Sequence, residues 1–205
     1  MDLNIIFQIV ILIISVMIHE ISHGTMALAF GDKTALYEGR LTLNPLKHID
    51  WFGSVVLPLF LFLTNAHFMI GWAKPVPYNP YNLKNRKVAE PLVAFAGPLS
   101  NMIIAVIFGI LIRILIPLNI SDTFIVSLEY VVIINISLAI FNLIPVPPLD
   151  GSKILFSFLP VGKQYIFSQS AQRYGILILI LIAFFLPSII SPVVFNLFHL
   201  ITGIN

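Results

Sequence analysis

The stretch LNIIFQIVILIISVMIHEISHGTMALAF, residues 3–30, decides the class of this protein. It exceeds the roughly 20 apolar residues that a helix needs to cross a bilayer. Its second half nevertheless contains His19, Glu20 and His23. Ionisable side chains inside a membrane are costly and usually functional. The stretch therefore predicts a membrane helix with an embedded site. It has no basic leading region or small-residue cleavage site, so we expect a retained helix, not a signal peptide.

Composition agrees with this interpretation. Hydrophobic residues make up 59% of the 205 residues, charged residues only 10%, and the mean hydropathy is +1.00. Soluble domains carry about 25% charged residues, so a soluble enzyme is excluded. The net charge of +2 without a basic cluster excludes a nucleic-acid binder, and the absence of cysteine excludes a thiolate metal site. The composition predicts an integral membrane protein.

Further apolar runs define the expected architecture, an all-α polytopic membrane protein with about four transmembrane helices in a single domain. Pro58 and polar residues interrupt the second run, and Pro187 and Pro192 lie inside the last, which we expect to cross once, kinked, although two crossings remain open. The runs after the first are residues 51–70, 89–117, 123–145 and 176–202.

Lysine and arginine predict how these runs are oriented. Ten of the eleven lie in the three loops that follow residues 3–30, 51–70 and 123–145. Short cytoplasmic loops collect basic residues, and all three loops share one side only if residues 51–70 enter the membrane and return. We therefore predict a re-entrant segment there, with the first and fourth runs parallel. Apolar and polar residues alternate weakly over residues 36–43, which predicts a short membrane-associated β-hairpin.

His19-Glu20-Ile21-Ser22-His23 is the strongest chemical signal. Histidines at i and i+4 project from one helix face and can bind one Zn²⁺, while the glutamate between them can act as general base. A chance match has a probability of roughly 0.002. The alternative is a buried polar cluster that helps helices pack.

A zinc site of this type needs a third protein ligand. Asp150 stands at the end of FNLIPVPPLDG, residues 141–151, where prolines must end the fourth helix. A carboxylate at such a break can reach a metal on a neighbouring helix. The same residue could instead cap the next helix near Ser152, and residue type alone leaves both roles open. The other candidates are His48, His67 and His199.

The sequence resembles the site-2 protease family of intramembrane zinc metalloproteases. The matching motifs are HEISHG at 19–24, GPLSN at 97–101 and NLIPVPPLDG at 142–151. NPLKHID at 44–50 and GWAKPVP at 71–77 resemble its compact prokaryotic branch. Many members carry a PDZ or sensor domain, and no loop here is long enough for one. How substrates are selected is therefore open.

The resemblance implies one Zn²⁺ per chain, with His19, His23 and Asp150 as ligands and Glu20 as catalytic base. Asn142 would help to hold the substrate, although a helix–helix hydrogen bond is an equal alternative. The implied activity is hydrolysis of peptide bonds within or near transmembrane segments, as in regulated intramembrane proteolysis. The partners would be a transmembrane protein or peptide substrate and the lipid bilayer. The implied location is a prokaryotic plasma membrane, with the site toward the cytoplasmic half.

Two functions of other classes compete with this interpretation. A small metal or proton transporter would place ionisable residues on several helices at mid-depth, whereas here they concentrate on two. A catalytically inactive scaffold would have no need of Glu20. GPLSN is expected to let helices approach closely, and His48 and Asp50 to shape their loop.

Overall fold

The computed structural model describes residues 3–56, 60, 63–64, 73–118, 120–160, 188 and 190–204. Three helices dominate it: α1 (Leu3–Ala29), α4 (Arg86–Leu115) and α5 (Asp122–Leu143). The apolar spans that correspond to them, Ile5–Ala29, Arg86–Leu118 and Asp122–Leu143, are each long and apolar enough to cross a bilayer. In each span, at most 28% of the 18 most apolar consecutive residues are buried, so most of these side chains face outward. Outward apolar faces of this length identify an integral membrane protein.

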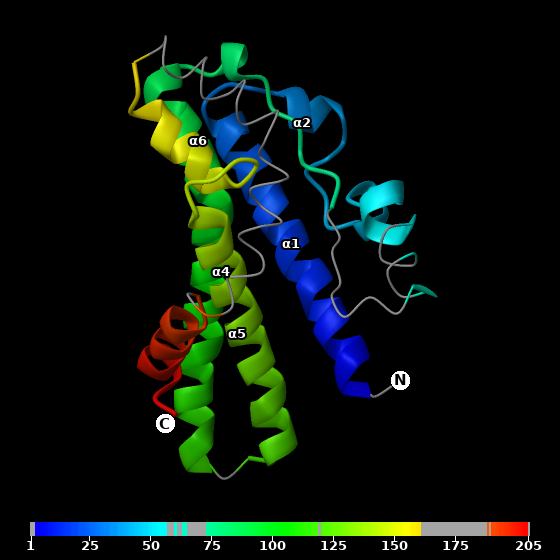
Figure 1. Cartoon of the computed structure of the whole chain (residues 1–205), viewed down its shortest axis with the longest axis vertical. Coiled ribbons are helices and arrows are strands. Elements are labelled where there is room, and N and C mark those ends of the chain that lie inside the picture. The colour runs from blue at the N-terminus through cyan, green and yellow to red at the C-terminus, as the bar shows by residue number, and fades with distance from the viewer. Residues whose placement is uncertain are drawn as a thin grey trace.

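The three long helices lie side by side, with α4 antiparallel to the other two (Figure 1). The parallel directions of α1 and α5 agree with the charge pattern of the loops. The short helix α6 (Asp150–Ser157) packs against α4 near the end where α1 terminates (Figure 1). As a result, the motif of α1 and the aspartate that opens α6 meet at one depth.

An apolar cluster holds the other end of the bundle together. Ala105 and Ile112 of α4 pack with Val132 and Ile136 of α5, and all four are fully buried. The C-terminal helix Ile190–Thr202 adds Val194 and Phe198 to this cluster.

The expected β-hairpin at residues 36–43 is wrong. A single helical turn, α2 (Thr34–Tyr37), stands there, and none of the described residues lies in a strand. The carboxylate of Asp32 starts this turn, because its Oδ1 accepts from the Thr34 amide at 3.1 Å and from the Thr34 hydroxyl at 2.6 Å. Gly39 then reverses the chain with φ of +61°. Local hydrogen bonds to Asp32 thus decide the structure of this segment, and the weak alternation of apolar and polar residues does not.

The other short elements are η1 (Pro45–Lys47), the π-helix η2 (Trp51–Val56), η3 (Pro80–Asn82) and η4 (Ile116–Leu118). Most of the expected re-entrant segment 51–70, including His67, lies outside the described residues, as does 176–187 of the last run. The described part of that run, Ile190–Thr202, is too short to cross a bilayer by itself. Three spanning helices are therefore described where we expected about four.

Candidate metal centre

Three buried side chains converge where α1 meets α6. Nε2 of His19 lies 3.1 Å from Nε2 of His23, and each of these atoms lies 3.1 Å from Oδ2 of Asp150. The three residues are 5%, 7% and 6% exposed. Within the described ranges they form a His–His–Asp group able to hold a metal ion.

The arrangement fits a cation of zinc's size. Tetrahedral zinc with bonds of about 2.1 Å holds its ligand atoms about 3.4 Å apart, close to the observed triangle. The other ring nitrogen of His23, Nδ1, lies 2.7 Å from the carbonyl oxygen of Val93. A carbonyl oxygen only accepts hydrogen bonds, so Nδ1 carries the hydrogen. In neutral His23, Nε2 then carries a lone pair and is an acceptor. Two acceptors, His23 Nε2 and Asp150 Oδ2, therefore face each other, and a cation between them would relieve the conflict.

Gly97 makes room for the histidines. A Cβ atom at this position would lie 2.5 Å from Nε2 of His23 and 2.6 Å from Nε2 of His19. Real Cβ contacts essentially never fall below 3.0 Å. The GPLSN motif therefore does more than let helices approach, because its glycine lies directly against both histidine rings.

The aspartate does not cap its helix. No side chain caps α6, and Asp150 is its first residue, with the carboxylate turned to the histidines. Its second oxygen, Oδ1, accepts from the ammonium of Lys153 at 3.1 Å. Between the two roles that sequence left open, the geometry favours the ligand role.

The glutamate of the motif lies beside the triad and is held by an extended segment. Oε2 of Glu20 accepts from the backbone amide of Val76 at 2.8 Å. Val76 packs closely on α1, where a Cβ at Gly24 would lie 2.7 Å from its side chain. A cavity of about 140 Å³ opens beside the group, lined by His19, Glu20, His23, Pro75, Val76, Tyr78, Asn142, Pro148, Asp150 and Lys153.

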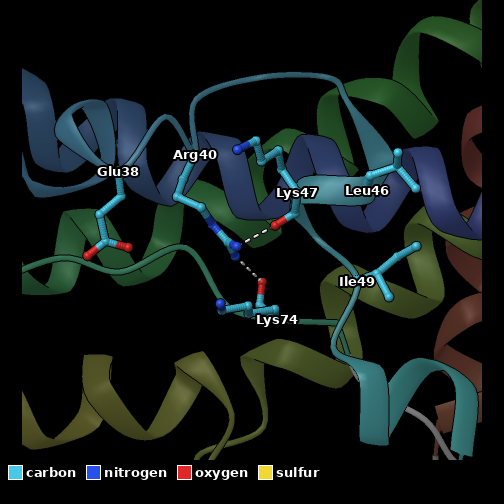
Figure 2. Close-up of a pocket in the computed structure, with 6 residues that line it drawn as sticks. All are labelled: Glu38, Arg40, Leu46, Lys47, Ile49 and Lys74. Atoms are coloured by element: carbon cyan, nitrogen blue, oxygen red, sulfur yellow. Dashed lines mark hydrogen bonds between the residues drawn. The ribbon is translucent and has the colours of Figure 1, made fainter.

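Arg40 holds that segment in place, a role that sequence reasoning missed. The buried guanidinium donates to the carbonyls of Lys47 and Lys74, the latter at 2.8 Å (Figure 2). It also donates to the carbonyl of Pro75 at 3.0 Å. It thereby joins two loops at the wall of a surface pocket of about 330 Å³. In the sequence it looks like any basic residue of a cytoplasmic loop, and no local pattern distinguishes it.

The other described candidates, His48, His199 and Asn142, are not part of the triad. His48 donates through Nε2 to the carbonyl of Thr42 at 2.8 Å, consistent with the expected loop-shaping role. His199 is on the C-terminal helix, where its ring contacts the carbonyl of Ile204. Asn142 lines the cavity, and its Nδ2 donates to the carbonyl of Leu138 on its own helix at 3.0 Å. That bond does not join two helices.

A His–His–Asp group able to hold a metal ion, beside a glutamate and among membrane-length apolar helices, is typical of membrane-embedded metallohydrolases. Comparison with known proteins narrows the class. The model of peptidase family M50 matches residues 117–186. The chain is 36% identical over 183 residues to "Putative zinc metalloprotease YwhC" of Bacillus subtilis, covering 86% of this chain and 79% of that protein.

Two further relatives have similar names. "Putative zinc metalloprotease MJ0611" of Methanocaldococcus jannaschii is 31% identical, over 73% of this chain and 72% of that protein. "Putative zinc metalloprotease Rip2" of Mycolicibacterium smegmatis is 27% identical, over 83% of this chain and 63% of that protein. No solved structure matches the chain significantly. The chain belongs to peptidase family M50, the site-2 proteases, and is a zinc metalloprotease.

Proposed function

We propose that this chain hydrolyses peptide bonds within or near transmembrane segments of membrane proteins, using one Zn²⁺ held by His19, His23 and Asp150. The observation that carries the proposal is the triangle of ligand atoms with 3.1 Å sides, set beside Glu20 in a cavity of about 140 Å³. Two nitrogens and one carboxylate oxygen leave a fourth position open, as catalytic zinc requires.

Glu20 acts as the general base. When bound, zinc supplies the Lewis acidity that polarises a carbonyl and makes a water molecule more acidic. The amide of Val76 holds one oxygen of the Glu20 carboxylate, which fixes the carboxylate and leaves its other oxygen to take a proton from water. Glu20 then returns that proton to the departing amine nitrogen.

The cavity wall would position the substrate. Asn142 and Lys153 line it on the side of α5 and α6. The Asn142 amide keeps its oxygen available, since the bond to Leu138 uses only its nitrogen. We propose that this oxygen accepts from a substrate amide. A helical substrate has its amides in internal hydrogen bonds, so it must unwind locally before it binds in this way.

The proposed orientation places the site in the cytoplasmic half of a prokaryotic plasma membrane. His19 lies ten residues before the end of α1 at Ala29, about 15 Å along the axis. Basic residues follow that end of α1 and precede α4, and they mark the cytoplasmic side. Regulated intramembrane proteolysis, with residues 51–70 as a re-entrant segment of a single membrane domain, is part of the same proposal.

Zinc content is the first test, since it needs no substrate. Elemental mass spectrometry of the purified, detergent-solubilised protein should find about one zinc per chain. His19→Ala and Asp150→Ala should lose it, while Glu20→Gln should retain it. A wild type without zinc, or variants with as much, would refute the ligand set.

Cleavage is the second test. The protein is reconstituted with a mixture of bacterial membrane proteins, and new peptide termini are mapped by mass spectrometry. New termini inside transmembrane segments should appear with the wild type and be absent with Glu20→Gln. Termini confined to soluble loops would contradict the proposed substrate class.

A further inference from the structure

Behind His19, on the side away from the cavity, a chain of neutral polar side chains crosses the bundle. Ser15 of α1, Asn101 of α4 and Asn135 of α5 are 3%, 0% and 0% exposed. The sequence motifs explain only Asn101, as the end of GPLSN. Nothing in the proposed chemistry uses Ser15 or Asn135.

The hydrogen bonds give this chain a direction. Nδ2 of Asn135 lies 2.9 Å from the carbonyl oxygen of Val131, which can only accept. The amide nitrogen of Asn135 must therefore face that carbonyl, and it also reaches the Ser15 hydroxyl at 2.9 Å. Its oxygen is left to face Asn101, whose Nδ2 lies 2.9 Å away.

A second carbonyl fixes the orientation of Asn101 independently. Nδ2 of Asn101 lies 3.3 Å from the backbone oxygen of Ser15, another group that only accepts. Both contacts of Asn101 therefore require its nitrogen on the side of Ser15 and Asn135. Its oxygen then faces His19, 2.6 Å from Nδ1.

An oxygen at that distance requires a hydrogen on Nδ1 of His19. We propose that Asn101, oriented by Asn135 and Ser15, is a positioning residue that fixes His19 as the Nδ1–H tautomer and so directs the Nε2 lone pair at the metal. The inference rests on the proposed function, because it assigns a role toward the same zinc ion. His23 reaches the same tautomer through the carbonyl of Val93.

If Asn101 only helped the helices to pack, a different effect on zinc affinity would be expected. Polar side chains commonly join membrane helices, and such contacts need no particular direction at His19. Partners behind metal-ligating histidines, by contrast, typically change metal affinity 10–100-fold when removed. Zinc affinity therefore separates the two roles, provided that loss of packing is controlled.

The affinity test compares three variants by competition with a chelator of known zinc affinity. Asn101→Leu removes the acceptor and should weaken zinc binding about 10–100-fold. Asn101→Asp keeps an oxygen toward His19 but cannot donate to Ser15 and Asn135, so it should retain more of the zinc affinity than Asn101→Leu does. Ile136→Ala is the control for loss of packing, because it removes buried apolar atoms next to Asn135 on α5 and leaves every polar side chain in place. Unchanged affinity in Asn101→Leu, or an equal loss in Ile136→Ala, would overturn the inference.

The tautomer itself can be read without metal. The zinc-free wild type is labelled with ¹⁵N-histidine, and the His19 signals are assigned by their loss in His19→Gln. These signals should show a hydrogen on Nδ1, the atom that faces the Asn101 oxygen. A His19 ring without hydrogen on Nδ1 would overturn the inference whether or not zinc binds. Failure of the wild type to bind zinc, with the expected tautomer present, would instead refute the proposed function.

Discussion

Gly97→Ala tests the metal centre through a single methyl group. Gly97 lies within α4, and alanine is the better helix former by about 1 kcal/mol. Helix propensity alone therefore predicts a more stable protein. The structure predicts damage, because the added Cβ would stand 2.5 Å from Nε2 of His23 and 2.6 Å from Nε2 of His19.

The size of the conflict follows from these distances. Ordinary van der Waals contact with a Cβ begins at 3.4 Å, so the His23 nitrogen must retreat by about 0.9 Å, the difference between 3.4 and 2.5 Å. Even the lower limit of 3.0 Å requires about 0.5 Å. Metal ligands tolerate about 0.2 Å. Both required movements exceed this tolerance, so we expect zinc binding to weaken at least about tenfold, or about 1.4 kcal/mol.

The assay is zinc affinity by chelator competition, with thermal stability of the metal-free protein measured alongside. Gly109→Ala is the matched control, since it is the same change on the same helix, with its close contact to the Ile201 side chain instead of a ligand. The control should keep wild-type zinc affinity. Wild-type affinity in Gly97→Ala would refute the reasoning, as would an equal loss in both variants.

Three other changes probe the base and the loops around it. Glu20→Gln should retain zinc while cleavage falls about 10²–10⁴-fold, because the amide cannot take the proton; single-turnover cleavage checks this. Arg40→Met removes three carbonyl contacts and should let Val76 shift, so that cleavage falls up to about 100-fold with zinc content unchanged, measured on one preparation. Burial disfavours the charged form of Asp32, but hydrogen bonds from Thr34, Asn82 and Asn79 hold its pKa below the usual 3.8. Its stabilisation is therefore present above about pH 4 and lost as the pH falls further, so the melting-temperature deficit of Asp32→Asn at about pH 7 should shrink at about pH 3.

The sequence predicted those features of the fold that follow from apolar length and from the charge of the loops. The membrane helices follow from apolar length, and α1 and α5 are parallel as the basic loops required. The parallel directions of α1 and α5 allow Asp150 to meet the motif of α1, whose two histidines lie 3.1 Å from its carboxylate. The weak alternation at 36–43 failed as a strand signal, because Asp32 offered the following backbone a local helical turn.

The contacts that the sequence could not predict join residues far apart in the chain. Asn101 meets His19 across 82 positions, and Asn135 meets Ser15 across 120. An asparagine in an apolar helix indicates a polar partner but does not say which. Arg40 is harder still, since its partners are backbone carbonyls and leave no trace in residue type.

The proposed metal ligands and the proposed base are held by different parts of the molecule. His19 is backed by Asn101 on a membrane helix, in a bundle closed by buried side chains of α4 and α5. Glu20 belongs to the same turn of α1, yet its carboxylate is oriented by Val76, on a loop segment that depends on Arg40. Changes in the bundle should therefore act on zinc affinity, whereas changes in the loops should act on turnover with zinc still bound. Any movement of the 73–77 segment as a substrate enters would alter the base and leave the metal in place.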